Sequence, residues 1–292
     1  MIPFLPVFEN DPFLKYSPWE DSSNYMLRHS HEMAFMFVFY MVIHALAPGA
    51  SKKLFGKNYS DLNLKGRINF DIHMVSMVQC VISITSLAPM WNHSYYQNRV
   101  EDAESSIFGY TSYGGLVASL AVGYFLWDVF VCIKYFESFG VGFLFHGVSA
   151  FYVFSTTMIP FCMPWIPAFL LFELSTPFVN MNFFASRLPA GAIPNNVVLI
   201  NGILLLVTFF SVRILWGFYA VSLVATDLYR TLGMINVFFP ICLLSINICL
   251  NSLNVFWFYK MLRIAKKKLG KGKPSEESAK AIAKEAAKID EI

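Results

Sequence analysis

The chain has 292 residues, of which 56% are hydrophobic and only 14% are charged, with a formal net charge of +3. Aromatic residues make up 17% of the chain, which suits a protein with broad lipid-facing and interfacial surfaces. This composition indicates an integral membrane protein, excludes the chemistry of a soluble enzyme, and gives no reason to expect a nucleic-acid partner.

Residues 1–31 form the first segment, which is rich in proline and aromatic side chains. It lacks the basic start, apolar core and small-residue cleavage site that a cleaved signal peptide requires. We therefore expect this segment to be lumenal and to pack along the membrane interface.

Residues 32–264 form the predicted membrane domain. A membrane-spanning helix needs roughly 20 mainly apolar residues, and about seven stretches meet this requirement. The last two stretches are longer than one span needs, so tilt or a kink at Pro240 must absorb the excess. The predicted spans are residues 32–48, 69–91, 113–136, 139–162, 164–186, 196–224 and 233–261.

The basic residues predict the orientation, because lysine and arginine near span ends stay on the cytosolic side. Opposite loops carry only Arg99 and Arg230, beside several acidic residues. The N-terminus is thus predicted to be lumenal and the basic, Ala-rich tail, residues 265–292, to be cytosolic. The basic residues on the cytosolic side are Lys52, Lys53, Lys57, Lys65, Arg67, Arg187, Arg263, Lys266, Lys267, Lys268, Lys271 and Lys273.

One glycosylation sequon, Asn92-His93-Ser94, falls in a loop that this topology makes lumenal. Short sequons also arise by chance, so whether Asn92 carries a glycan stays open. The five cysteines have none of the spacings of a zinc or disulfide framework. The six histidines are dispersed, unlike the clusters that bind two irons. We therefore expect no metal and no bound cofactor.

Ionisable and amide side chains inside the predicted spans are the strongest functional signal. Such groups are costly at bilayer depth and usually face a protein interior or a water-filled cavity. With a rise of about 1.5 Å per residue, Asp128, His146 and Asn180 each fall about 10 Å from the predicted cytosolic end. Glu173 falls near the middle of the membrane and Arg213 nearer the lumen, so we expect these two to compensate each other's charge.

Helical spacing groups the polar residues of the fifth span. Glu173, Thr176 and Asn180 are spaced i, i+3 and i+7, which places them on one face. Pro177 removes a backbone donor in the same turn and is predicted to kink the helix. A second stripe, which includes His73 and Ser76, is interpreted mainly as hydrogen bonding between helices rather than as the lining of a site.

The order of WNH, GYFLWD, FLFHG, LFELSTPFVNMNFF, VRILWGFY and LNVFWFYKM resembles the TLC-domain family, which contains ceramide synthases and smaller lipid proteins. The resemblance covers about residues 68–264 and is strongest to small fungal members with seven spans. It implies an all-α polytopic fold with six helices in a ring around a central, lipid-accessible cavity. It also implies residence in the endoplasmic reticulum membrane and a role in membrane lipid homeostasis.

The resemblance also assigns positions. Asp128 and His146 match the aspartate of the third span and one member of the family's histidine pair, and they are the candidate catalytic residues. Gly147 stands where ceramide synthases have the second histidine, and their Asp-rich signature is missing, so ceramide synthesis itself is not expected. The candidate lipid-binding residues are Glu173, Thr176, Asn180 and Arg213.

Two functions are favoured, and an ion channel or transporter stays conceivable, although the sequence has no evident internal repeat or repeated ring of charges. In the first, His146 acts as a general base or acyl acceptor, oriented by Asp128, and acyl-CoA is the co-substrate of acyl transfer to a lipid. In the second, the protein binds, transfers or senses a lipid without changing it, and His146 only holds helices together. Membrane lipids, with an acyl chain in the central cavity, are the expected partners in both cases.

Overall fold

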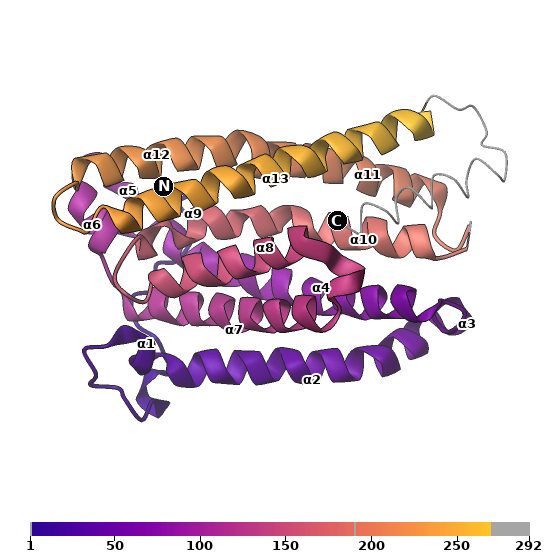
Figure 1. The fold of residues 1–292 in the computed structure, drawn as a ribbon, viewed down its shortest axis with the longest axis horizontal. Coiled ribbons are helices and arrows are strands. Elements are labelled where there is room, and N and C mark those ends of the chain that lie inside the picture. The colour runs from indigo at the N-terminus through magenta and orange to yellow at the C-terminus, as the bar shows by residue number, and fades with distance from the viewer. Residues whose placement is uncertain (1, 190, 270–292) are drawn as a thin grey trace.

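The computed structural model describes residues 2–189 and 191–269, which form helices joined by short turns. The described residues contain no strand, and the long helices run side by side along one axis (Figure 1). Most of the predicted tail, residues 265–292, lies outside the described residues. The prediction of an all-α protein is confirmed.

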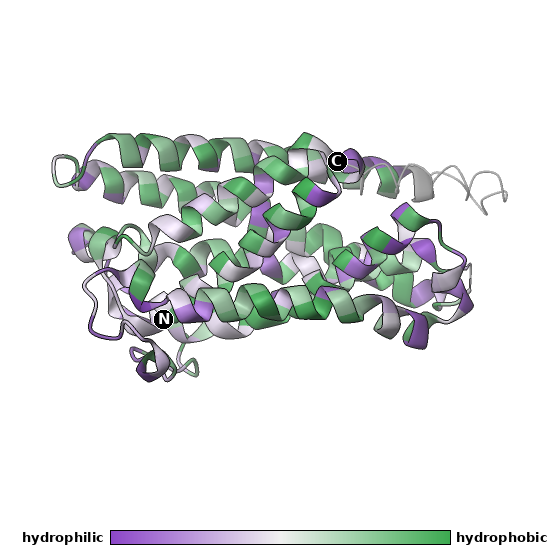
Figure 2. Ribbon diagram, turned by 60° about the horizontal axis from the view of Figure 1, so that its bottom comes forward, coloured by the Kyte–Doolittle hydropathy of each residue, from purple (hydrophilic) through white to green (hydrophobic). Residues whose placement is uncertain are grey.

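Six long helices in the described part of the chain are long and apolar enough to cross a membrane, which confirms a multi-pass membrane protein. Hydrophilic residues gather at the two ends of the bundle, and hydrophobic residues dominate the helices between them (Figure 2). The six are α2 (Ser30–Phe55), α4 (Leu64–Trp91), α7 (Ser112–Lys134), α8 (Phe136–Thr156), α11 (Asn195–Phe209) continuing through a π-helical turn (Phe210–Leu215) into α12 (Trp216–Arg230), and α13 (Phe238–Leu269).

Several helices, among them α2 and α13, begin or end some residues away from the predicted bounds. α2 runs seven residues past the predicted end at 48, through the lysines of its last turn, which can extend their charged ends beyond the apolar region. The last helix begins at Phe238, not 233, because Gly233 has a φ of +97° and the Asn236 side chain accepts a hydrogen bond from the Phe238 backbone N–H at 2.9 Å.

The predicted fifth span is a broken helix. It begins with Pro164 in a short 3₁₀ turn, and Pro167 and Pro177 lie in the first turns of the α-helical pieces, where proline does not disturb the helix. Next to Pro177 the backbone changes from a 3₁₀ turn to an α-helix, and the Glu173 carbonyl accepts a bond from the Thr176 backbone N–H. The pieces are a 3₁₀ turn (Met163–Trp165), α9 (Ile166–Leu170), a second 3₁₀ turn (Leu171–Ser175) and α10 (Thr176–Arg187).

Contacts between neighbouring helices close a ring that consists of five of the six long helices and the broken helix, which was the seventh predicted span and is not among those six. In order around the ring, α4 contacts α10, α10 contacts α11, α11 and α12 contact α13, α13 contacts α8, α8 contacts α7, and α7 returns to α4. The remaining span, α2, packs outside the ring against α7 and α4. This is the arrangement of six helices with one at the side that the resemblance implied.

The N-terminal segment folds over one end of the bundle, near α1 (Tyr25–Arg28), α5 (Ser94–Gln97) and α6 (Ala103–Phe108). The Asn92 side chain, where α4 ends, accepts a bond from the Ile2 backbone N–H at 2.9 Å. Its Nδ2 donates to the carbonyls of Ile2 and Leu5. Both amide hydrogens of this sequon are therefore used in holding the N-terminal segment. The opposite end carries α3 (Lys57–Ser60) (Figure 1).

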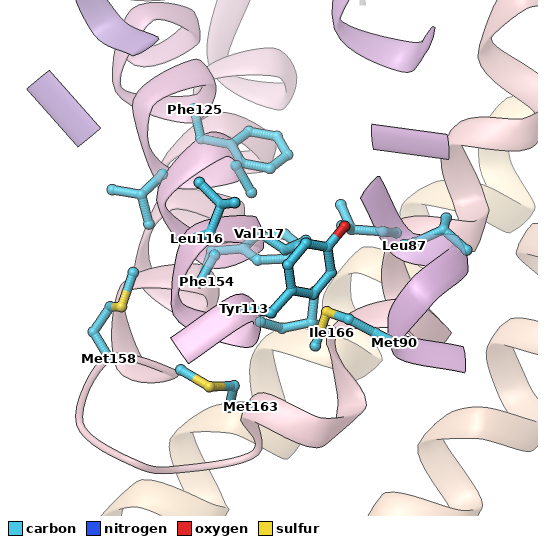
Figure 3. Packing of buried hydrophobic residues seen from close by; sticks show 14 of the residues in the cluster. Leu87, Met90, Tyr113, Leu116, Val117, Phe125, Phe154, Met158, Met163 and Ile166 are labelled. Atoms are coloured by element: carbon cyan, nitrogen blue, oxygen red, sulfur yellow. The ribbon is translucent and has the colours of Figure 1, made fainter. Parts of the chain in front are cut away.

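A dense apolar cluster fills the half of the ring nearer the N-terminal segment. Side chains from α4, α7, α8 and the region of α9 converge there (Figure 3). Phe125 of α7 stacks on Phe154 of α8, with ring centroids 5.4 Å apart. Buried area of this kind stabilises by about 25 cal/mol per Å². Phe125 also meets the His146 ring edge-on, so the apolar cluster ends at Phe125 and the polar interior of the ring begins there.

Candidate functional site

The polar residues expected to form a site come from four different elements of the ring. Asp128 lies in α7, His146 in α8, Glu173 in the 3₁₀ turn before α10, and Arg213 in the π-helical turn. Glu173 is within electrostatic range of both Asp128 and Arg213, and Arg213 is within range of His146. The ring thus gathers these four side chains into one interior region, here called the interior polar cluster.

Arg213 joins two irregular stretches of helix. Its Nε donates to Ser175 Oγ at 2.8 Å, and its Nη2 donates to Thr176 Oγ1 at 3.1 Å. The guanidinium also lies over the ring of Phe209, 5.2 Å from the centroid. A π-helical turn is rare and often occurs at functional positions. Here it presents the arginine to the break in the neighbouring helix.

Glu173 was predicted to compensate the charge of Arg213. The hydrogen bonds of the guanidinium instead go to the two hydroxyl groups, and within the described chain none joins it to Glu173. The carboxylate stays within electrostatic range, so the two charges still favour each other. The Glu173 oxygens are left without a hydrogen bond from the described residues.

Asn180 is occupied by contacts with α4. Its Oδ1 accepts from His73 Nδ1 at 2.7 Å, and its Nδ2 donates to Ser76 Oγ at 3.2 Å. The imidazole of His73 stacks on Phe183 with the centroids 3.7 Å apart. These bonds agree with the interpretation of His73 and Ser76 as contacts between helices. Asn180 therefore belongs to a packed junction beside the interior polar cluster.

His146 is half-buried and makes no hydrogen bond within the described residues. It meets aromatic rings edge-on, with centroids 6.3 Å from Phe125 and 5.7 Å from Trp257. Neither ring nitrogen is among the enclosed polar atoms that lack a partner. Both nitrogens therefore keep accessible surface and are available to a ligand.

Asp128 lies close to Gly147, the position at which the resemblance places the second histidine of ceramide synthases. A Cβ atom at Gly147 would lie 2.7 Å from Asp128 Oδ2, so any larger residue there must displace the carboxylate. The other oxygen, Oδ1, accepts a weak hydrogen bond from Cys132 Sγ at 4.0 Å. Among the described residues no hydrogen bond joins Asp128 to His146, so the orienting contact that the resemblance implied is not made.

Two residues of this region were missed in the sequence. Tyr124 is one helical turn before Asp128 and is within electrostatic range of both Asp128 and Glu173. Its spacing of i, i+4 with Asp128 was the available signal. Trp257 of α13 contacts His146, but a single tryptophan in an apolar helix carries no signal that separates it from lipid-facing residues.

Comparisons with known proteins agree with this architecture. The family model for the TLC domain matches residues 69–263. The chain is 40% identical to Topoisomerase I damage affected protein 4 of Saccharomyces cerevisiae, over 91% of this chain and 94% of that protein.

Two more distant relatives come from other organisms. A TLC domain-containing protein of Schizosaccharomyces pombe is 32% identical over 80% of this chain and 78% of its own length. Human TLC domain-containing protein 4 is 27% identical over 79% of this chain and 83% of its own length. No solved structure matches the chain. The family match and the fungal relatives together show that the chain belongs to the TLC domain family.

Proposed function

We propose that this protein binds a membrane lipid inside its helical ring and acts in membrane lipid homeostasis. The observation that carries the proposal is the unpaired state of the interior polar cluster. Polar groups buried within membrane proteins normally find hydrogen-bond partners, because an unsatisfied group in an apolar surrounding is costly. His146 and Glu173 have no partner among the described residues yet keep accessible surface, which favours a ligand as the missing partner.

The cluster suits the polar part of a lipid. Arg213 uses two of its nitrogens on hydroxyl groups, and its remaining donors are available to a phosphate or ester oxygen. His146 and Glu173 add a donor or acceptor and a negative charge. Because the apolar cluster of Figure 3 fills the opposite half of the ring, the lipid is proposed to enter from the end that carries the basic residues.

Lipid retention by the purified protein tests this proposal. Wild-type protein in a mild detergent is expected to carry a lipid of defined mass in native mass spectrometry. The His146→Asn variant is expected to lose most of it. His44→Asn is the matched control, because His44 is also half-buried and meets Trp127 edge-on at 5.5 Å, but on α2 outside the ring. Wild type without lipid, or equal loss in both variants, would contradict the proposal.

A second candidate function is transfer of an acyl group from acyl-CoA to a lipid hydroxyl or amine. The free ring nitrogens of His146 favour it, since one nitrogen can take the proton of the attacking group. The new ester or amide bond forms as the thioester breaks, and coenzyme A leaves as the thiol. Incubation with acyl-CoA and candidate acceptors should release free thiol in wild type but not in His146→Asn. Turnover that survives this substitution would remove His146 as the catalyst.

The membrane and the orientation belong to the same proposal. The basic residues lie where α2, α7, α10 and α13 end and where α4 begins, and Figure 1 draws these positions at one end of the bundle. Because basic residues favour the cytosolic side, we assign this end to the cytosol and the opposite end to the lumen of the endoplasmic reticulum. Protease access to a C-terminal tag in sealed microsomes tests this orientation, and protection of the tag would contradict it.

A further inference from the structure

Three ionisable side chains meet where the N-terminal segment packs against the start of α2, apart from the interior polar cluster. His29 Nδ1 lies 2.8 Å from Glu32 Oε2 and 3.5 Å from Asp11 Oδ2. One ligand-type atom from each of the three residues lies within 4.8 Å of the other two. The set is closed off from solvent, since His29 is 0%, Glu32 is 5% and Asp11 is 9% exposed.

Neighbouring groups fix the direction in which each side chain points. Asp11 Oδ1 accepts from the Phe13 backbone N–H at 2.7 Å, which turns Oδ2 towards the histidine. His29 Nε2 lies 2.7 Å from the Tyr110 hydroxyl, so Nδ1 is the nitrogen that faces the carboxylates. A Cβ atom at Gly115 would overlap the imidazole, so only glycine allows α7 to approach this closely.

Two oxygens of the set lack a partner. Asp11 Oδ2 and Glu32 Oε1 are both enclosed and make no hydrogen bond in the described structure. The nearest basic group to Glu32 Oε1 is His31 Nε2, at 3.6 Å, and Arg28 lies instead over the Tyr110 ring at 6.0 Å. Two buried, nearly adjacent carboxyl groups thus face one imidazole without a full complement of donors.

Electrostatics makes this arrangement costly for the protein alone. Burial, with a further contribution from the Glu32 carboxyl, raises the pKa of Asp11 to about 7. Burial lowers the pKa of His29 to about 4, although the Asp11 charge opposes that shift. A positive charge between the three groups would remove the repulsion and supply the missing partner for both free oxygens.

We propose that Asp11, His29 and Glu32 bind a divalent transition-metal ion, with Zn²⁺ the best fit. Zn²⁺ binds both imidazole nitrogen and carboxylate oxygen, and a site with three protein ligands leaves the fourth position for water. Tetrahedral bonds of about 2.0–2.2 Å put neighbouring ligand atoms roughly 3.3–3.6 Å apart. The observed separations from the imidazole nitrogen are 2.8 and 3.5 Å, and all three ligand atoms lie within 4.8 Å, so small side-chain shifts would reach this geometry. Tyr110 then accepts from His29 Nε2–H and holds the neutral imidazole in the tautomer that binds metal.

The proposed metal site differs from the expectation from the sequence. No metal was expected, because the histidines are dispersed and the cysteines lack zinc spacing. The ligands come from the segment before the TLC domain match and from the start of α2, and only the fold brings them together against α7. A bound ion would fasten the N-terminal segment to the first span.

Metal analysis of the full-length protein tests the proposal directly. Protein stripped with a chelator should take up one equivalent of Zn²⁺ by mass spectrometric metal analysis, and its melting temperature in detergent should rise by several degrees. Co²⁺ bound in its place should show the visible absorption that is typical of tetrahedral coordination. This measurement uses wild-type protein and needs no variant. Uptake below about 0.1 equivalent, or no Co²⁺ absorption, would overturn the proposal.

Conservative variants locate the ion. Asp11→Asn and Glu32→Gln keep the shape of the side chain and should weaken Zn²⁺ binding at least tenfold. Glu9→Gln is the matched control, because Glu9 is an exposed carboxylate of the same segment. Unchanged Zn²⁺ affinity in both ligand variants would overturn the proposal. An Asp11→Asn protein more stable than wild type, with no response of either to Zn²⁺, would instead indicate a shared proton and also overturn it.

Discussion

Two kinds of buried polar residue occur in this protein, and they differ in whether their hydrogen bonds are satisfied. At the end of the bundle that carries α3, Asp71 accepts from Ser51 Oγ at 2.9 Å and from the Tyr59 hydroxyl at 2.8 Å. Inside the ring, His146 and Glu173 have no such partners among the described residues. Satisfied groups hold helices together, whereas unsatisfied groups with accessible surface are those a ligand can complete. Whether a buried polar group has its hydrogen-bond partners therefore separates structural residues from candidate binding residues.

The largest loss of stability is expected for Asp71→Ala. This change leaves two buried hydroxyl groups unpaired where α2, α3 and α4 meet, and should cost about 4 kcal/mol. The unfolding free energy from a denaturing-detergent titration measures it. Asp71→Asn, which keeps one acceptor, should cost clearly less. Equal losses would show that the carboxyl charge, not the paired acceptors, stabilises this end.

Arg213→Met should cost about 2 kcal/mol, because it removes two charge-assisted hydrogen bonds, one to Ser175 of the 3₁₀ turn and one to Thr176 of α10, but keeps an apolar side chain of similar length. It should also reduce lipid retention. Arg213→Lys keeps the charge but not the two-nitrogen geometry, so it should retain part of the lipid. A Met variant that is as stable as wild type would show that the junction of the two irregular helices does not depend on Arg213.

Gly147→Ala tests the close approach of α7 and α8. The added methyl group would lie 2.7 Å from Asp128 Oδ2, and overpacking of this kind should cost about 1–2 kcal/mol. Gly202→Ala is the control, because a Cβ atom there meets nothing within 4 Å, and alanine should raise stability slightly through its helix propensity. Melting temperatures of the two variants should therefore move in opposite directions, and a parallel change would argue against the contact.

The smallest effect on stability is expected for His146→Asn. Because no hydrogen bond to the described residues is lost, the cost should be about 0.5 kcal/mol, from reduced contact with Phe125 and Trp257. The same variant should lose lipid, so stability and binding change independently. A loss of several kcal/mol would instead place His146 with the structural residues of the comparison.

Much of the fold follows from the sequence, because long apolar stretches and the positions of lysine and arginine are direct consequences of the bilayer. The arrangement of six helices in a ring was predicted from the family resemblance and not from the apolar stretches themselves. The broken fifth span was partly predictable, since Pro177 signals a kink but does not show that a 3₁₀ turn will satisfy the Glu173 carbonyl.

The candidate site was less predictable, because depth along a helix does not specify a hydrogen-bond partner. Asp128, His146 and Asn180 share a calculated depth, yet Asn180 bonds to His73 and Ser76 of α4. Sequence spacing also cannot find a set such as Asp11 and Glu32, whose ligand atoms are brought together by a segment folding back over the bundle.

The π-helical turn has a consequence for the long span that contains it. One extra residue in a turn rotates all later side chains by about 100° relative to an uninterrupted α-helix. α11 packs on α10, whereas α12 packs on α6 and α9, so the two halves present different faces to different neighbours. A single-residue deletion between Phe210 and Leu215 would restore regular periodicity and turn one half's packing face towards lipid. The packing of this span thus depends on the rotational register between α11 and α12, which a substitution of a single side chain does not change.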